Sequence, residues 1–264
     1  MKLLEIVDDG PIRTIAINRP ERRNALNYAT LMEIREAIKD TKAKAKSGEA
    51  VRAVVITGRG GAFSSGADVK EWSSKKKDAD EPGHDWVAVA LQMMQDVFEL
   101  PIPTVAMIDG AAAGAGLDLA LCCDFRFASD RSKFVCAYTR IGFPPDAGGS
   151  WLLPRLIGIE RAKLFVYTGD MWDGTKAHQN GMVTEVHKPE ELEAATMAFA
   201  RKLASGPSVA QGQAKGLLDR AQNRAFAEQL REEHRAGRIC SETWDHKEAL
   251  AAFAERREVK FQGK

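Results

Sequence analysis

The stretch DGAAAGAGLDLALCCD, residues 109–124, decides the fold, because it takes the chain from a strand into a helix through a few small residues. It follows the apolar run TVAMI at residues 104–108, and residues 110–116 are all Gly or Ala. Such residues allow a tight turn and a close approach of the backbone to a ligand. The Leu/Ala segment after the turn predicts a helix, whose first-turn amides are unpaired donors at the positive end of the helix dipole.

A second turn of this kind lies in FSSGADVKEW, residues 63–72, which follows the apolar strand VVITG. Two amide groups at strand-to-helix turns are what an oxyanion hole requires, and each donor contributes roughly a hundredfold to a thousandfold in rate. A thioester oxygen needs such donors, because it gains negative charge when the adjacent carbon loses its proton. The run GAGLDL is not a dinucleotide fingerprint, since Leu119 stands in the place of the third glycine.

Two acidic residues complete the candidate site. Asp118 lies between two leucines near the start of its predicted helix, and Asp146 follows a Pro-Pro turn in IGFPPDAGGSWLLPRLIG, residues 141–158. An acid ahead of a helix is often an N-cap, so a structural role for either residue stays open here. Carboxylates among apolar neighbours have raised pKa values, which suits groups that transfer protons near neutrality.

The pattern along the chain predicts a layered α/β fold, because short β-branched runs alternate with helical periods. We expect strands at Thr14–Asn18, Val54–Thr57, Thr104–Ile108, Phe125–Ala128 and Phe134–Cys136, and helices at Leu31–Lys46 and Val87–Leu100. From about residue 189 the pattern is helical only. We therefore expect a core of residues 1–188 and a helical region of residues 189–264. Residues 73–85, rich in charge and containing Pro-Gly, are predicted to form a surface loop that acts as a lid.

Composition excludes several classes of partner. The 264 residues carry a net charge of +1, which favours neither nucleic acid nor an anionic membrane surface. No segment reaches the length of a membrane span and the N-terminus lacks a signal-peptide pattern, so we expect a soluble, cytoplasmic protein. The four cysteines form no CxxC pair and are interpreted as reduced thiols. The five histidines show no metal-ligand spacing, so no metal site is expected.

The motifs resemble the crotonase family of enoyl-CoA hydratases and isomerases along nearly the whole chain. The resemblance rests on six motifs in the family's order: INRPERRNALN, FSSGADVKEW, DGAAAGAGLDLALCCD, IGFPPDAGGSWLLPRLIG, TGDMWDGTKAHQNGMVTEV and AFAERREVKF. It implies a spiral of ββα units with a C-terminal helical trimerisation region, whose trimers often pair into hexamers. It also implies that the two oxyanion amides belong to Ala67 and Ala115. The family often has glycine at the second position, and an alanine there requires a backbone angle that a Cβ tolerates.

The chain departs from the hydratase pattern at one acid. Hydratases of the family usually carry two glutamates, and the matching positions here hold Asp118 and Tyr138. A tyrosine cannot replace the second carboxylate in holding and splitting water at neutral pH. Asp146 matches the catalytic aspartate of the dienoyl-CoA isomerase and epoxyphenylacetyl-CoA isomerase branches. The resemblance therefore favours double-bond isomerisation with Asp146 as base and Asp118 as its assistant, with enoyl-CoA hydratase as the alternative.

Two further alternatives remain at this stage. Aryl-CoA dehalogenases resemble the chain around KFVCAYTRIG and place a nucleophilic aspartate at Asp146, but their helical histidine falls on Leu91. A non-catalytic acyl-CoA-binding protein is the other alternative, although two retained acids argue against it. Trp151 and Trp172 are interpreted as core or interface aromatics.

The resemblance also implies an acyl-CoA substrate, no separate cofactor because coenzyme A is part of that substrate, and a homotrimer or hexamer. Arg23 is expected to neutralise phosphate, as are Arg256 or Arg257 from a C-terminal helix. The residues that we expect to bind substrate or coenzyme A are Arg23, Ala25, Ser65, Asp68, Val69, Gly114, Tyr138, Pro145, Arg256 and Arg257.

Overall fold

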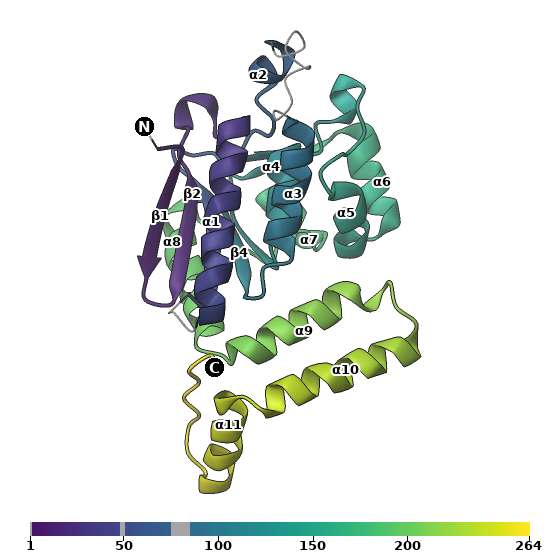
Figure 1. Cartoon of the computed structure of the whole chain (residues 1–264). Helices are drawn as coiled ribbons and strands as arrows, with labels where there is room; N and C mark the ends of the chain where they lie inside the picture. Colours follow the sequence, from purple (N-terminus) through teal and green to yellow (C-terminus); the bar gives the residue numbers. More distant parts are fainter. Residues whose placement is uncertain (1, 48–50, 75–84) are drawn as a thin grey trace.

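The computed structural model describes residues 2–47, 51–74 and 85–264 (Figure 1). The predicted lid at residues 73–85 therefore lies almost wholly outside the described residues. No helix in the described ranges is long and apolar enough to cross a membrane.

The larger sheet of the described chain has six strands in the order β1-β2-β3-β4-β6-β9. Strands β1 and β2 are antiparallel, and each later neighbour pair is parallel. Parallel neighbours place the carboxyl ends of β3 and β4 at the same edge, where the two small-residue turns follow. The bounds are β1 Leu4–Asp9, β2 Ile12–Ile17, β3 Ala53–Gly58, β4 Thr104–Ile108, β6 Phe125–Ser129 and β9 Glu185–His187.

A smaller sheet in the order β5-β7-β8 lies beside these turns. Its strands are β5 Ala111–Ala113, β7 Lys133–Val135 and β8 Met171–Asp173. Strand β5 follows β4 after only two residues, so the chain steps from one sheet into the other just before the Leu/Ala helix. The ββα spiral inferred from the resemblance is confirmed by this arrangement and by the structural relatives described below.

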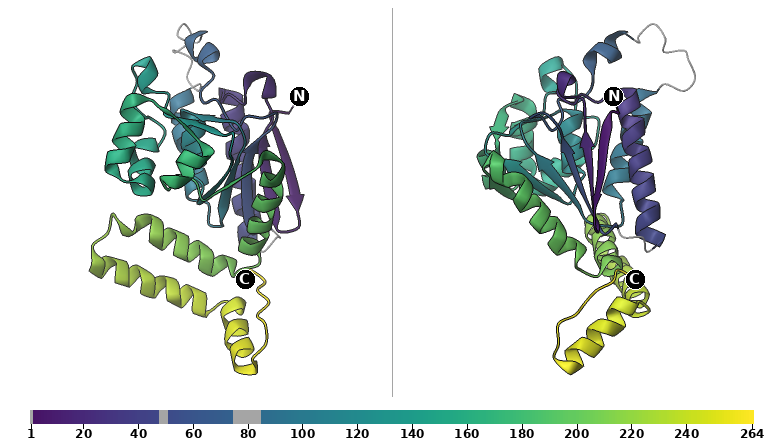
Figure 2. Two further views of the ribbon diagram at one scale, coloured as in Figure 1. Left: turned by 180° about the vertical axis from the view of Figure 1, so that it is seen from behind. Right: turned by 90° about the vertical axis from the view of Figure 1, so that its left-hand side faces the viewer.

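Helices cover both faces of the larger sheet (Figure 2). On one face, α1 (Tyr28–Ser47) and α3 (Trp86–Phe98) bury Leu31, Ile34 and Met93 against alternate strand residues such as Val54 and Ile56. On the other face, α8 (Pro189–Ala204) packs Leu192, Ala200 and Ala204 against Ala53, Val55 and Val105. Successive residues of β3 thus enter opposite cores, as the two-residue repeat of a strand requires.

Short helices link these layers and carry much of the site. They are η1 Pro20–Arg22, α2 Val69–Ser74, α4 Ala115–Leu121, η3 Thr139–Ile141, α5 Gly149–Ile157, α6 Ile159–Thr168 and α7 Gly174–Gln179.

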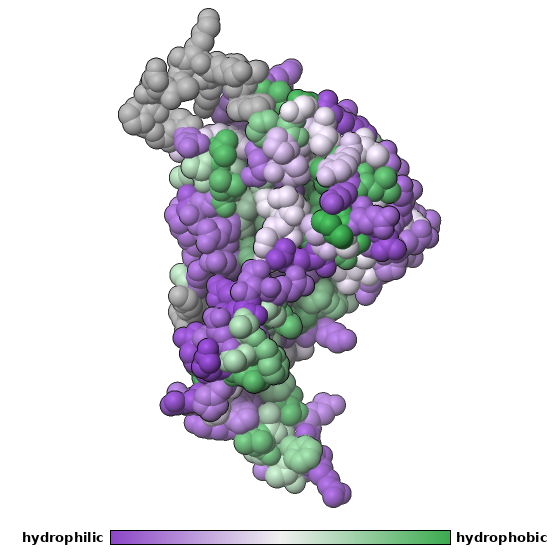
Figure 3. All heavy atoms as spheres, turned by 90° about the vertical axis from the view of Figure 1, so that its right-hand side faces the viewer, coloured by the Kyte–Doolittle hydropathy of each residue, from purple (hydrophilic) through white to green (hydrophobic). Residues whose placement is uncertain are grey.

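The last three helices extend away from the sheet body. Helices α9 (Ser208–Ala221), α10 (Phe226–Ser241) and α11 (Trp244–Glu255) lie below it in Figure 1. Arg52, just before β3, ties them to the body, because its guanidinium donates hydrogen bonds to Ser208 Oγ at 3.0 Å and to the Phe261 carbonyl at 3.1 Å. Figure 3 shows apolar side chains gathered over this lower part of the molecule.

The strands and helices expected in the first 140 residues are confirmed, with ends displaced by a few residues. The pattern did not reveal β1, β5, β8 or β9, of which all but β1 are three residues long. The helical region begins at Pro189 as expected, but its first helix, α8, packs on the sheet. The division into domains at residue 188 stays a prediction.

Candidate active site

The two small-residue turns lie side by side. A parallel bridge pairs Ser64 with Ala112, and the Ala113 amide donates to the Ser64 carbonyl at 3.0 Å. Ala67 and Ala115 each lie three residues beyond that bridge on their own segments. The parallel register therefore brings the two predicted oxyanion amides to the same level of the fold.

Glycine is required at Gly66 for this approach. Its φ is +88°, and a Cβ there would lie 2.5 Å from the Ala113 carbonyl oxygen and 3.4 Å from the Ala115 amide nitrogen. A side chain would separate the two turns and strain the backbone. Gly66 thus holds Ala67, its neighbour in the chain, next to Ala115.

Both amides are available as donors. The bridge between Leu26 and Ala67 uses the Gly66 carbonyl and the Asp68 amide, which leaves the Ala67 N–H outside it. Ala115 opens α4, so its N–H has no partner within the helix. Neither amide donates to another group in the part of the chain that the structure describes.

Ala115 replaces the family's frequent glycine without strain. The positive φ that the turn needs falls on Gly114, at +50°, and Ala115 itself is helical. Gly114 also lies against the Tyr138 ring, since a Cβ there would be 3.9 Å from Tyr138 Cζ. The requirement for a backbone angle that a Cβ tolerates is therefore met.

Asp118 is buried beside the two amides, one turn further along α4. Its carboxylate Oδ2 accepts a hydrogen bond of 2.5 Å from the Tyr138 hydroxyl. Its Oδ1 lies against Gly149, the first residue of α5, because a Cβ on that glycine would be only 2.2 Å away. Burial raises the pKa of Asp118 to about 7, opposed by the hydrogen bond from Tyr138 and reinforced by the charge of Asp146. Asp118 therefore exchanges its proton near neutrality.

Asp146 is half-buried and close enough to Tyr138 and Asp118 to be coupled to both. Burial raises its pKa, and the nearby Tyr138 hydroxyl lowers it. The N-cap of α5 is Gly148, and no side chain makes the capping hydrogen bond. Asp146 is thus not the cap of this helix, and the structural alternative for it fails.

Tyr138 joins the two acids. Burial and the neighbouring carboxylates raise its pKa, so its hydroxyl stays protonated and acts as a donor. The ring is 8% exposed and comes from the turn between β7 and η3. A neutral donor thus stands between two carboxylates whose pKa values are both raised.

Several predicted coenzyme A residues lie along one rim of the site. Arg23 is exposed, with φ +49°, and its carbonyl accepts the Ser65 amide at 3.0 Å. Ala25 is buried, and Val69 is 57% exposed at the start of α2. Asp68 is held by Arg19 in a mostly buried ion pair of 3.1 Å. Pro145, beside Asp146, is partly buried.

The structure does not bring Arg256 and Arg257 to this site within one chain. Both follow α11, at the opposite end of the molecule from α2 in Figure 1. Arg257 is paired with Glu248 at 2.5 Å and Glu255 at 2.6 Å. A phosphate contact from either arginine in this protomer's site is therefore not seen, and their role stays a prediction.

Asn24 is a positioning residue that the sequence reasoning missed. It is fully buried, and its Nδ2 donates to the carbonyls of Arg59 at 2.8 Å and Ala62 at 2.6 Å. Its own carbonyl accepts the Ser64 hydroxyl at 2.8 Å. Asparagine tolerates its φ of +55° better than most residues. The signal in the sequence that could have identified this position was an asparagine directly after Arg23.

No group of three or more His, Cys, Asp and Glu side chains among the described residues is placed to hold a metal ion. Cys122, Cys123 and Cys136 are buried free thiols, and Cys240 is a partly buried one.

Comparison with known proteins shows to which family the chain belongs. The sequence profile of enoyl-CoA hydratase/isomerase matches residues 9–264. The chain belongs to the enoyl-CoA hydratase/isomerase family. It is therefore an enzyme of this family, and the resemblance inferred from six motifs is confirmed.

Relatives in the family include both isomerases and hydratases. The chain is 31% identical to the 1,2-epoxyphenylacetyl-CoA isomerase of Escherichia coli, over 99% of this chain and 98% of that protein. It is 34% identical to the trans-2-decenoyl-acyl-carrier-protein isomerase of Streptococcus mutans, over 100% and 98%. The crystal structure of an enoyl-CoA hydratase from Bacillus anthracis superposes with a TM-score of 0.92 at 31% identity and covers 100% of both chains.

Proposed function

We propose that this enzyme of the enoyl-CoA hydratase/isomerase family moves a double bond within an enoyl-CoA thioester by proton transfer. The observation that carries the proposal is the hydrogen bond of 2.5 Å from the Tyr138 hydroxyl to Asp118. It occupies an oxygen of the buried acid with a neutral donor, where a hydratase has a second carboxylate to share a water. Water addition therefore lacks the second carboxylate that would hold the water, whereas proton transfer by Asp146 does not need that carboxylate.

The proposed reaction starts with the thioester oxygen between the N–H groups of Ala67 and Ala115. Ionised Asp146 removes a proton from a carbon next to the double bond, so that a C–H bond breaks and a dienolate forms. The two amides stabilise the negative charge on oxygen. Asp146 then returns the same proton to the carbon at the other end of the conjugated system, and no atom is gained or lost.

Asp118 and Tyr138 tune this transfer. The charge of Asp146 disfavours ionisation of Asp118, while the Tyr138 hydroxyl favours the ionised form of both acids. A raised pKa makes Asp146 a stronger base than an ordinary carboxylate, as long as it remains ionised at the working pH. The neutral Tyr138 donor thus keeps Asp146 in its basic form within a partly buried site.

The substrate is an acyl-CoA, and the proposed reaction needs no separate cofactor. Arg23 lies on the exposed rim beside Ser65 and is the residue that we assign to a coenzyme A phosphate. Proton transfer between carbons requires neither a redox group nor a metal.

The test is a panel of enoyl-CoA thioesters incubated with the enzyme in deuterated water, with a chelator present and no nicotinamide added. Isomerisation gives a product of unchanged elemental composition, apart from exchanged hydrogen, with a displaced double bond. A product heavier by one molecule of D₂O identifies a hydratase. Dependence on zinc or on a nicotinamide would contradict the cofactor proposal.

Enoyl-CoA hydratase is the second candidate, favoured by the pKa of about 7 at Asp118. An acid that is half protonated at neutrality is suited to hand a proton to carbon while Asp146 holds water. In that case D₂O addition dominates, and Asp118→Asn is more damaging than Asp146→Asn.

A dehalogenase and a non-catalytic binding protein are supported less. Leu91, where the dehalogenase branch has its histidine, lines a cavity next to Ala147 but supplies no base. A protein that only binds acyl-CoA has no need of two coupled acids beside two free amides.

A further inference from the structure

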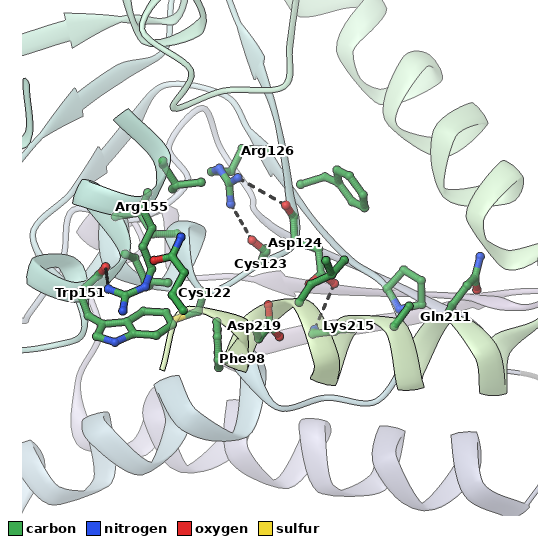
Figure 4. A pocket seen from close by; sticks show the side chains of 18 of the residues that line it. Phe98, Cys122, Cys123, Asp124, Arg126, Trp151, Arg155, Gln211, Lys215 and Asp219 are labelled. Carbon is green, nitrogen blue, oxygen red and sulfur yellow. Dashed lines mark hydrogen bonds and ion pairs between the residues drawn. The ribbon is translucent and has the colours of Figure 1, made fainter. Parts of the chain in front are cut away.

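Two cavities meet at a wall behind the carboxylates. The first, which we call the carboxylate-side cavity, has a volume of about 260 Å³. The second, the α9 cavity, lies between the sheet body and α9 with a volume of about 480 Å³ (Figure 4). Both are lined by the same four residues, which therefore form the wall between them: Phe98, Cys122, Trp151 and Leu152.

The carboxylate-side cavity lies beside the segment that carries Asp146. Ala147 and Gly148, which follow Asp146 directly, form part of its lining. Cys122, the C-cap of α4, lies one helical turn beyond Asp118. A chain attached to a thioester between Ala67 and Ala115 therefore has this cavity beside it.

The lining of this cavity suits hydrocarbon. Leu91 and Met94 come from α3, and among the described residues that line the cavity Gln95 carries the only amide and none is charged. Burying apolar surface here is favourable, while a charged or strongly polar tail would lose its hydration without compensation.

The wall is braced on both sides. The rings of Phe98 and Trp151 meet edge to face, with centroids 5.6 Å apart. The Arg155 guanidinium lies over the Trp151 ring, 3.5 Å from its centroid, and donates a hydrogen bond of 2.8 Å to the Trp151 carbonyl. Figure 4 shows Trp151 and Arg155 against each other at one end of the α9 cavity. Such contacts hold an aromatic ring in one position.

We propose that Trp151, braced by Phe98 and Arg155, ends the acyl site and restricts the enzyme to short acyl chains. The inference rests on the proposed function. The carboxylate-side cavity, at about 260 Å³, has roughly half the volume of the α9 cavity, at about 480 Å³. A chain that extends through the carboxylate-side cavity meets the wall that Trp151 forms, and a longer chain can continue past that wall only into the α9 cavity.

The test compares butenoyl-, hexenoyl- and decenoyl-CoA as substrates of the wild type and of Trp151→Ala. The wild type should have the higher kcat/KM for the two shorter chains. Each additional buried methylene contributes roughly fourfold to binding. Trp151→Ala should therefore raise the decenoyl to butenoyl ratio of kcat/KM by about ten- to a hundredfold. Trp151→Leu, a milder change, should give an intermediate ratio if the alanine variant folds poorly.

Phe199→Ala is the matched control, because Phe199 is an aromatic residue of the core under α8 and lines neither cavity. It should leave the chain-length ratio unchanged. Saturated butanoyl- and decanoyl-CoA, which cannot react, give Kd values that test the wall separately from the reaction.

The outcomes are distinct. A wild type that accepts decenoyl-CoA as well as butenoyl-CoA, or a folded Trp151→Leu enzyme with unchanged ratios of kcat/KM and Kd, overturns the inference about Trp151. A wild type that isomerises no thioester of any length overturns the proposed function instead, and the ratio of the two Kd values still decides whether Trp151 limits the chain.

Discussion

The Tyr138 hydroxyl lowers the pKa of both Asp118 and Asp146, which gives the site a testable pH dependence. Without this donor, both carboxylates hold their protons to higher pH. Tyr138→Phe should therefore move the acidic limb of the kcat/KM profile upward by about one pH unit, given the strength of a hydrogen bond to a charged group. The two acids titrate as a coupled pair, so the limb reports both.

The control for this change is Tyr167→Phe, which removes a hydroxyl from a side chain that is 72% exposed. Its profile should match the wild type. An acidic limb that stays in place or moves to lower pH in Tyr138→Phe would show that the tyrosine does not favour the ionised acids.

Asp146→Asn tests the base. The substitution keeps the size of the side chain, and no helix cap is lost because Gly148 is the N-cap of α5. We expect kcat to fall by about two to four orders of magnitude while the Kd for a saturated acyl-CoA stays close to normal. Asp118→Asn should lower kcat by less, and the control Asp170→Asn, at an exposed residue, should leave kcat unchanged. An Asp146→Asn enzyme with the wild-type rate would end the isomerase proposal.

The raised pKa of Asp118 also predicts how the stability of the protein depends on pH. Its pKa is about 7 in the folded chain, against about 3.9 in an unfolded one. Between these values the folded state binds more protons than the unfolded state, so stability falls as pH rises through this window and is level above it. Asp118→Asn removes this loss, which amounts to a few kcal/mol at about 1.4 kcal/mol per pKa unit.

The measurement is the melting temperature of Asp118→Asn and wild type at pH 4.5 and pH 8. The variant should gain more at pH 8. An equal difference at both values would show that the carboxyl of Asp118 ionises as easily in the folded chain as in the unfolded one.

At the residue level, the sequence indicated which acids belong to the candidate site, but not how they contact each other. Asp118 and Asp146 were identified from their apolar surroundings, and the structure brings both to Tyr138. The hydrogen bond that joins them was not predictable, because residues 118 and 138 meet only through the pairing of β5 with β7. Asn24 was missed for the same reason, since its partners are 35 and 38 residues away.

At the level of elements, the first residue of α5 fixes where Asp118 can lie. Gly149 has no positive φ, so alanine suits its backbone, but a Cβ would lie 2.2 Å from Asp118 Oδ1. Gly149→Ala should therefore fold normally and displace the carboxylate. A displacement of this kind lowers kcat by up to about a hundredfold.

Gly216→Ala in α9 is the matched substitution, because no atom lies within 4 Å of the added Cβ. It should keep full activity and raise the free energy of unfolding by about 0.5–1 kcal/mol. If Gly149→Ala behaved in the same way, the position of Asp118 would not depend on α5.

The longer helices and strands were predictable because their hydrophobic patterns extend over enough residues to be recognised. Helices α1 and α3 show a clear helical period, and β3 and β4 are apolar runs buried on both faces. Strands β5, β8 and β9, with three residues each, are too short to show a period and form only where neighbouring segments supply partners. The spiral of ββα units, to which these short strands belong, was expected from the family resemblance and not from the strand pattern.

At the scale of the molecule, helices α9 to α11 have little to hold them within one chain. Only Ser208 is buried in α9, only Ala236 in α10, and only Asp245 and Ala252 in α11 among the described residues. Their large apolar side chains are exposed: Leu218, Phe226, Leu230, Ile239, Trp244, Leu250 and Phe253. Apolar surface of this extent is typical of an interface, and a helix pair that buries so little is marginal by itself.

The last prediction is that the protein is a trimer or a hexamer in solution, with these helices at its subunit contacts. Phe253, which is 85% exposed in the single chain, should be covered by a partner. Sedimentation velocity at micromolar concentration should give one species of three or six chains. Phe253→Asp should shift it toward smaller species, since a buried unpaired charge is costly. Val7→Asp, which places the same charge on β1 at a residue that is 45% exposed, should leave the assembly intact. A wild-type protein that sediments as a stable monomer would contradict the prediction, because α9 to α11 would then leave their apolar side chains in water.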